Sequence, residues 1–173
     1  IEAISEELPP GIDLSHDGRF KGMISLKAKN YVLLMEDGSL TIKGSSLRSR
    51  RDERLFRDFI KEIARLLIEG RQEEASEHYR ETARRITQGD VPPQDLSRRE
   101  TISEKTFSNP KLRRLAAAAD GVSVGERISV YQRRDGSLAQ VEHYDGDEDR
   151  DYLLRRLHDM ASRFADLFEP EAF

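Results

Sequence analysis

The chain has 173 residues, of which 36% are hydrophobic and another 36% are charged. A chain of this length holds one ordinary domain or two small ones and can bury a hydrophobic core. No apolar run approaches the roughly 20 residues that a membrane-spanning helix needs, which excludes such a helix from this sequence. The formal net charge of −4 argues against a protein devoted wholly to nucleic acid, so the placement of the charges matters more than their sum.

The chain contains no cysteine, which excludes disulfides and thiolate chemistry and fits a reducing compartment. We therefore predict a cytoplasmic protein. The first residue is isoleucine, and Glu2, Glu6 and Glu7 stand where a signal peptide would have its basic and apolar regions. We expect the sequence to be a piece of a longer protein.

The first third of the chain has the pattern of a small antiparallel sheet. Residues 1–8 are expected to be the last turns of a helix, which the prolines of 9–11 end. Short apolar runs at 12–14 and 20–26 predict two strands around a turn at 16–18. Runs at 31–35 and 40–42 flank Asp37-Gly38, a dipeptide that favours a tight hairpin turn. Together these strands predict a β-meander.

The middle of the chain predicts two helices. Asp52 is the expected N-cap of the first, whose apolar residues recur between 55 and 67 with the spacing of one helical face. Gly70 is expected to end it. The second helix is predicted over 72–88 and ends at Gly89. Because the connection is short, we expect the two helices to pack antiparallel.

The last third is predicted to be mixed. We expect a helical turn at 94–96, an extended segment at 98–104 and a third helix over 110–119, which begins at Pro110. A hairpin is predicted from 127–132 and 138–143, followed by a last helix over 147–168. The fold class is therefore α+β, a small antiparallel β-meander followed by a mostly helical part that carries a β-hairpin.

Several motifs with catalytic or metal-binding potential do not fit. The acidic run at 145–151 lacks the glycine and glutamate spacing of a calcium loop, and we interpret it as stabilising the N-terminus of the last helix. His16, His78, His143 and His158 have no metal-ligand spacing and are expected at the surface. No phosphate-binding loop or nucleophile motif occurs. We predict no catalytic residue, no metal site and no bound cofactor in this chain.

Basic residues concentrate between positions 43 and 65, while acidic residues collect at 145–151. Lys27, Lys29 and Tyr31 alternate, so a single strand would point all three to one face. Two ammonium groups and a phenol on one face would suit the phosphates and sugars of a nucleic acid. On this interpretation, the basic residues that follow should form a one-sided patch.

This region resembles family B DNA polymerases just after their catalytic palm motifs. The resemblance is carried by Lys29-Asn30-Tyr31, the Asp37-Gly38 turn, Lys43-Gly44 and Arg50-Arg51-Asp52, followed by a long amphipathic helix. The family has a lysine-lysine-any-tyrosine motif there, then a lysine-glycine, and then the helical thumb. The first lysine of the motif is Ala28 in this chain. A fainter likeness continues to the C-terminal end.

The resemblance implies a site and a division of the chain. The residues expected to contact DNA are Lys27, Lys29, Tyr31, Lys43, Arg48, Arg50, Arg51, Arg98, Arg99 and Lys105. Gly44 and Asp52 are expected to be structural. Residues 1–52 would be the outgoing edge of the palm, and residues 53–173 would be the thumb.

The implied parent enzyme extends DNA from deoxynucleoside triphosphates with magnesium. Its partners would be primer–template DNA and the rest of the polymerase chain, namely the palm and fingers. The catalytic aspartates would lie outside this chain, which alone should be inactive. Two alternatives are a stand-alone α+β adaptor with charged helices, marked by an exposed apolar groove, and a complete small enzyme.

Overall fold

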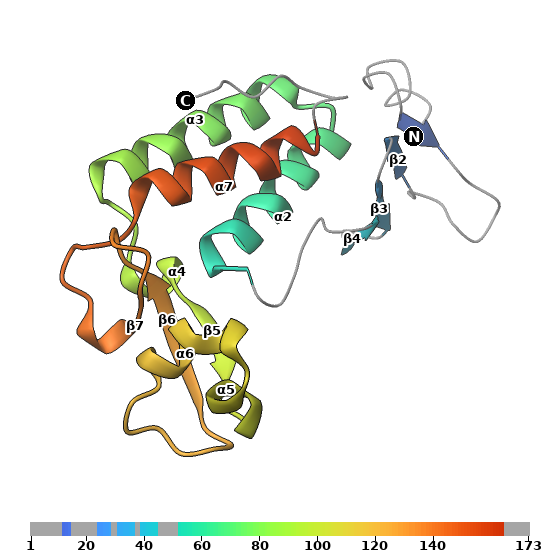
Figure 1. Ribbon diagram of the computed structural model, residues 1–173. Coiled ribbons are helices and arrows are strands. Elements are labelled where there is room, and N and C mark those ends of the chain that lie inside the picture. The colour runs from blue at the N-terminus through green and yellow to red at the C-terminus, as the bar shows by residue number, and fades with distance from the viewer. Residues whose placement is uncertain (1–11, 15–23, 29–30, 37–38, 45–51, 165–173) are drawn as a thin grey trace.

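The structure is a computed structural model that describes residues 12–14, 24–28, 31–36, 39–44 and 52–164 (Figure 1). Its first part is a four-stranded antiparallel sheet in the order β1-β2-β3-β4. The strands are β1 (Ile12–Leu14), β2 (Ile24–Ala28), β3 (Tyr31–Glu36) and β4 (Ser39–Gly44). The predicted meander is confirmed, because each strand pairs with the next one along the chain.

The β3–β4 hairpin forms at the position that the Asp-Gly dipeptide predicts. Its last two cross-strand pairs before the turn are Met35 with Leu40 and Glu36 with Ser39. Ile42 is buried, whereas its neighbours Thr41 and Lys43 are exposed. This alternation places one face of the hairpin against the core and the other face in solvent.

Three helices form the centre of the molecule, namely α2 (Arg54–Ile68), α3 (Gln72–Gln88) and α7 (Arg150–Ser162). Helices α2 and α3 pack antiparallel as predicted, and α7 packs beside both (Figure 1). Gly70 and Gly89 follow α2 and α3 with φ angles of 76° and 74°. Glycine reaches this left-handed conformation at no steric cost, which explains why both helices end there.

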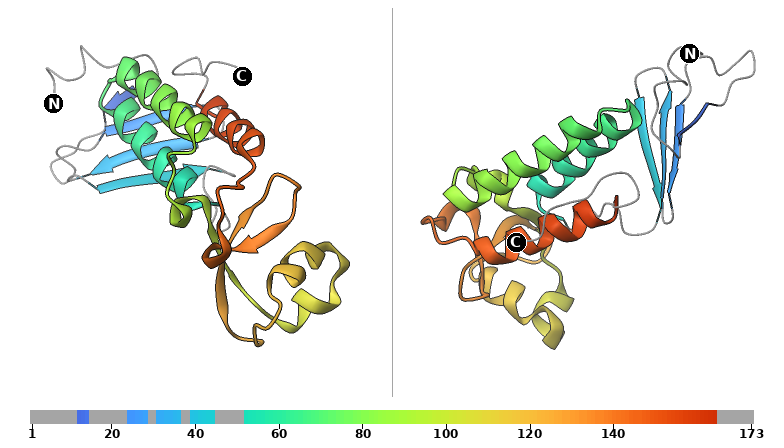
Figure 2. Two further views of the ribbon diagram at one scale, coloured as in Figure 1. Left: turned by 90° about the vertical axis from the view of Figure 1, so that its left-hand side faces the viewer. Right: turned by 90° about the horizontal axis from the view of Figure 1, so that it is seen from above.

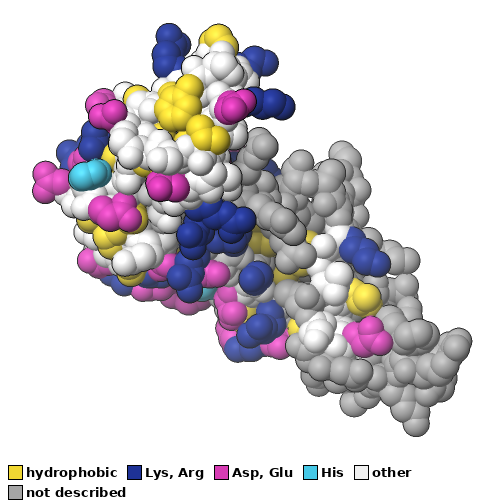
Figure 3. All heavy atoms as spheres, turned by 90° about the horizontal axis from the view of Figure 1, so that it is seen from below, with side chains coloured by type: hydrophobic (Ala, Val, Ile, Leu, Met, Phe, Trp, Pro, Cys, Tyr) yellow, Lys and Arg dark blue, Asp and Glu magenta, His cyan; other side chains and the backbone are white. Residues whose placement is uncertain are grey.

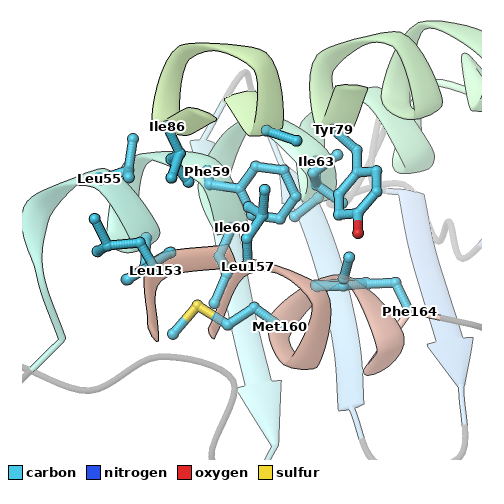
Figure 4. Close-up of a cluster of buried hydrophobic side chains, with 14 of the residues drawn as sticks. Leu55, Phe59, Ile60, Ile63, Tyr79, Ile86, Leu153, Leu157, Met160 and Phe164 are labelled. Atoms are coloured by element: carbon cyan, nitrogen blue, oxygen red, sulfur yellow. The ribbon is translucent and has the colours of Figure 1, made fainter. Parts of the chain in front are cut away.

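The main core lies between these three helices (Figure 4). Helix α2 contributes Phe59 and Ile63, helix α3 contributes Tyr79, and helix α7 contributes Leu157 and Met160. All five side chains are at most 2% exposed. Helix α2 also packs against strands β2, β3 and β4, so the sheet is attached to the helical layer through this helix (Figure 2).

Residues 98–140 form a smaller unit below the helices in Figure 1, which we call the tip module. It follows the short helix α4 (Pro93–Leu96) and contains β5 (Arg98–Thr101), α5 (Glu104–Ser108), the 3₁₀ turn η1 (Pro110–Leu112), α6 (Arg113–Ala118), β6 (Arg127–Gln132) and β7 (Leu138–Gln140). The strands form an antiparallel sheet in the order β5-β6-β7. A separate aliphatic core that includes Ile102, Leu115 and Val130 holds the module together.

The structure corrects several predicted boundaries. The predicted extended segment 98–104 is a strand only to Thr101, because α5 begins at Glu104. The predicted third helix over 110–119 begins as the η1 turn and becomes α-helical at Arg113. The second hairpin strand ends at Gln140, and residues Val141–His143 form a 3₁₀ turn, η2.

The last helix begins at Arg150 and not at residue 147, because the acidic run that precedes it has other partners. Asp149 is the N-cap, and its side chain accepts a hydrogen bond from the Tyr152 amide at 3.1 Å. Asp147 accepts one from the Tyr131 hydroxyl at 2.6 Å, and Glu148 accepts one from the Tyr144 hydroxyl at 2.5 Å. These carboxylates fix the loop before the helix. The predicted end of this helix lies outside the described residues.

The predicted α+β class is confirmed by the two antiparallel sheets and the helices between them. Among the described residues, no helix has the length and hydropathy that a membrane crossing requires. Within the same residues, no three metal-ligating side chains come together as a metal site.

Candidate nucleic-acid interface

Lys27 and Tyr31 belong to two different strands, so the predicted alternation along one strand is wrong. Lys27 lies in β2 and Tyr31 begins β3, the next strand along the chain. In the register, Lys27 stands opposite Val32, whereas Tyr31 stands opposite Ala28 and Gly44. The two residues therefore occupy different cross-strand rows of the sheet.

The register instead places Lys27 and Lys43 in one row, because both stand opposite Val32. Residues of one cross-strand row share a face of the sheet. Lys43 is exposed, and its neighbour Ile42 is buried in the main core, so the Lys43 side of the sheet faces away from α2. Lys29, Arg48, Arg50 and Arg51 lie outside the described residues.

Helix α2 carries a row of cations along its solvent face, which we call the α2 basic row. Its members are Arg54, Arg57, Lys61 and Arg65, which the spacing of three or four residues brings to one side of the helix. The acidic residues Asp58 and Glu62 lie on the side that faces α3, where both line the pocket between α2 and α3. Figure 3 shows Lys and Arg side chains gathered across the middle of one face of the molecule.

The α2 basic row is neutralised in part. Arg54 and Arg65 make ion pairs with Asp58 and Glu62 at 3.8 and 3.9 Å, between side chains that are more than 40% exposed. Arg54 makes a second ion pair, with Asp95 at 3.7 Å. No ion pair joins Lys61 to a carboxylate among the described residues. Among the described residues, Arg57 and Lys61 are the members of the row that make no such pair.

Two buried carboxylates lie at the start of α2. Asp52 and Glu53 are 8% and 3% exposed, and each has a partner from another part of the chain. Asp52 accepts a hydrogen bond of 2.5 Å from Arg156, whose guanidinium also lies 5.6 Å from the centre of the Phe56 ring. The prediction that Asp52 is the N-cap is wrong, since Glu53 occupies that position and Asp52 instead binds α7.

Glu53 joins three elements at this point. Its Oε1 atom accepts a hydrogen bond of 2.8 Å from the Tyr152 hydroxyl of α7 and lies 3.7 Å from Nη1 of Arg98 at the start of β5. Burial, and after it the charge and hydrogen bond of Glu53, raise the pKa of Tyr152 to about 12. We call the contacts among Asp52, Glu53, Arg98, Tyr152 and Arg156 the joint network.

Arg98 is held inside the protein. Its side chain is 18% exposed and donates a 2.9 Å hydrogen bond to Glu100, in addition to the pair with Glu53. Arg98 therefore positions β5 against the start of α2, and its role in DNA binding stays a prediction. Arg99, the next residue on the strand, is exposed.

Arg98 and Lys105 meet at a pocket of about 310 Å³ in the tip module, which we call the tip pocket. The pocket is lined by Arg98, Glu100, Thr101, Ser103, Lys105, Thr106, Lys111, Leu112, Arg114, Leu115 and Leu138. The sequence interpretation did not select Lys111 and Arg114. Their closeness to Lys105 in the sequence was the available signal, comparable to the clustering that we noted between residues 43 and 65.

A second pocket, of about 340 Å³, lies between α2 and α3 and has a charged lining that includes Asp58, Glu62 and Arg85. His78 lines it and stacks on Phe59, with ring centres 5.6 Å apart. Burial lowers the pKa of His78. His78 and His158 are both half-buried, and Nδ1 of His158 lies 3.3 Å from the Tyr79 hydroxyl, so the predicted surface position is wrong for these two. His143 is exposed as predicted, and His16 lies outside the described residues.

Comparisons with known proteins find a likeness in structure and not in sequence. No protein-family model matches the chain, and no curated protein matches it. Among solved structures, it is similar to the family B DNA polymerase of the hyperthermophilic archaeon Pyrobaculum calidifontis, with a TM-score of 0.69 and 17% identity. The match covers 86% of this chain and 22% of that polymerase. The chain therefore has the fold of a part of a family B DNA polymerase.

Proposed function

We propose that this chain is the palm edge and thumb of a family B DNA polymerase and holds primer–template duplex. The single observation that carries the proposal is the fold likeness over 86% of the chain. The motif residues between Lys29 and Asp52 support the same assignment. The boundary between palm and thumb is proposed near residue 52, where the joint network lies.

In this proposal the duplex is held by its phosphates and not by its sequence. A polymerase must accept any sequence, so its contacts go to the backbone and to the degenerate minor groove. Lys43 and the α2 basic row offer cations on a strand and on a long helix, both attached to one core. Such rigid elements fix the distances between the charges, which favours a ligand with regularly spaced phosphates.

The chemistry of the parent enzyme is assigned to residues outside this chain. Nucleotidyl transfer uses two metal ions that clamp the attacking and leaving oxygens, and the proposed parent would use magnesium. The role proposed for this chain is to hold the duplex and to support the rest of the polymerase. It is expected to bind DNA weakly by itself and to catalyse no extension.

Titration of a fluorescent primer–template duplex with the 173-residue chain tests the proposal by anisotropy. Lys43 and the three least paired residues of the α2 basic row predict a slope of log affinity against log salt of roughly −3 to −4. Lys61→Gln should weaken binding and reduce the slope by about one. Arg84→Gln, on the exposed face of α3 where Glu81 pairs with it, is the matched control and should leave the slope unchanged.

Two results would count against a duplex-holding role, namely no binding at low salt and binding that does not depend on salt. The adaptor alternative has no specific observation in its favour. An adaptor is expected to expose an apolar groove, whereas the groove between α2 and α3 has a charged lining. Binding that does not depend on salt concentration would favour the adaptor alternative.

A further inference from the structure

The tip pocket carries a strong local excess of positive charge. Four cationic side chains and one carboxylate line it, so its net formal charge is +3 in a space of about 310 Å³. The carboxylate, Glu100, already pairs with Arg98 at 2.9 Å. The excess therefore rests on Lys105, Lys111 and Arg114.

No ion pair joins these three residues to a carboxylate among the residues that the structure describes. Helix α3 shows the contrasting arrangement, since Arg80 and Arg84 each pair with a glutamate three residues away. Like charges that converge without acidic partners repel one another, and a bound anion removes that cost. The pocket thus favours a ligand that supplies negative charge.

The shape of the pocket and its hydrogen-bond donors narrow the class of anion. Arg114 is held in place, because its Nη1 atom donates to the Gly136 carbonyl at 2.8 Å and to Gln132 Oε1 at 3.3 Å. A guanidinium has five donors in a fixed plane, and those that remain suit an anion with several oxygens. The hydroxyl groups of Thr101 and Ser103 line the same pocket and can also donate.

We propose that the tip pocket binds a phosphate group, with Lys105 and Lys111 as its mobile cations and Arg114 as its fixed donor. Phosphate matches this set because its oxygens accept several charge-assisted hydrogen bonds at once. The phosphate belongs either to a nucleic-acid backbone or to a free phosphorylated molecule such as pyrophosphate. A nucleic-acid backbone as the source rests on the proposed function. The proposal that the pocket binds phosphate does not depend on it.

The test is an NMR titration of the ¹⁵N-labelled 173-residue chain with inorganic phosphate and with pyrophosphate. The expected result is saturable shifts of backbone amides in β5, α5 and α6. Lys111→Ala should weaken pyrophosphate binding roughly tenfold, since one charge-assisted hydrogen bond is lost. Arg113→Ala is the matched control, because Arg113 is exposed at the start of α6, two residues after Lys111, and does not line the pocket.

Equal weakening by Lys111→Ala and Arg113→Ala would overturn the proposal, as would shifts scattered over the whole surface. Unchanged amide spectra outside the tip module show that both variants are folded. Addition of duplex DNA then identifies the source. Displacement of pyrophosphate by the duplex assigns the pocket to a backbone phosphate. If the chain binds pyrophosphate but no duplex, the phosphate site is supported and only the DNA-holding function is overturned.

Discussion

The helical layer and the tip module are stabilised by cores of different size and composition. The helical layer buries large aromatic residues such as Phe56, Phe59 and Tyr79 in one continuous core. The tip module has a small aliphatic core of its own, a three-stranded sheet and short helical turns, and its Tyr131 and Ala139 belong to the main core. Since stability follows buried apolar area, the helical layer is expected to be the more stable part.

The two regions also differ in whether their cationic side chains form ion pairs. On α3 and just before it, arginines at positions 71, 80 and 84 each pair with a glutamate three residues away. In the tip pocket, Lys105 and Lys111 have no such partner among the described residues. The arginines of α3 are thus offset by carboxylates, whereas the lysines of the tip pocket are available to a ligand.

The largest expected effect comes from breaking the core of the helical layer. Phe59→Ala should lower the free energy of unfolding by about 3–5 kcal/mol, because it removes a fully buried ring and leaves a cavity. Urea denaturation followed by circular dichroism measures this loss. Leu115→Ala, in the core of the tip module, is the comparison.

Leu115→Ala should speed amide hydrogen exchange in β5 and β6 and leave α3 protected, if the tip module opens as a unit of its own. An equal loss of protection in α3 and β6 would mean that the two regions unfold together. In that case the contrast between the two cores would have no consequence for stability.

A smaller effect is expected at the joint network. Tyr152→Phe should lower the free energy of unfolding by about 1–3 kcal/mol near neutral pH, because Glu53 loses a hydrogen bond while buried. Exchange of the β5 amides should also increase, since Glu53 is the carboxylate that Arg98 contacts. Tyr144→Phe, which removes a similar hydrogen bond to Glu148 outside the joint, should leave β5 unaffected.

Tyr152→Phe also provides a test through the pH dependence of stability. The pKa of Tyr152 is raised from 10.0 to about 12, so the folded state holds this proton more tightly than the unfolded state. Its contribution to stability is complete below pH 10 and is lost as the pH rises toward 12. Denaturation midpoints measured between pH 9 and 11 should therefore fall less steeply in Tyr152→Phe than in the unaltered chain. An identical slope would contradict the environment described for Tyr152.

The smallest effect is expected for the paired charges of α3. Glu81→Gln breaks the pair with Arg84, and the unfolding midpoint should stay within experimental error, because exposed pairs contribute little. The variant removes one carboxylate from beside Arg84, which keeps its pair with Asp90 at 3.9 Å. Duplex affinity that rises as much as it falls in Lys61→Gln would mean that net charge, and not its placement, governs binding.

The parts of the fold that depend on local signals could be predicted from the sequence. The Asp37-Gly38 dipeptide located the β3–β4 hairpin, and the apolar spacing between residues 55 and 67 located α2. Gly70 and Gly89 marked helix ends because their role is a property of one backbone position. Such features need no knowledge of the rest of the chain.

The features that the sequence did not reveal depend on partners far along the chain. Asp52 has the residue type of an N-cap, yet its carboxylate accepts a hydrogen bond from Arg156. Arg98 looked like one more exposed cation, and only the packing of β5 beside α2 shows that Glu53 holds it. Lys27 and Tyr31 were placed on one strand because no glycine or proline separates them in the sequence, yet they belong to β2 and β3.

The joint network has a consequence for the order in which the chain folds. The backbone amide of Arg54 in the first turn of α2 donates to the Ser97 carbonyl at 3.2 Å, and the Tyr152 and Arg156 contacts join residues 99 and 104 positions apart. During synthesis from the N-terminus, α2 can form early. The partners of Asp52 and Glu53 in α7 are synthesised about 100 residues later. Closing such long loops is slow, so the joint is expected to form late. Until then two carboxylates remain in water at the start of α2, and their burial requires that α7 has been made.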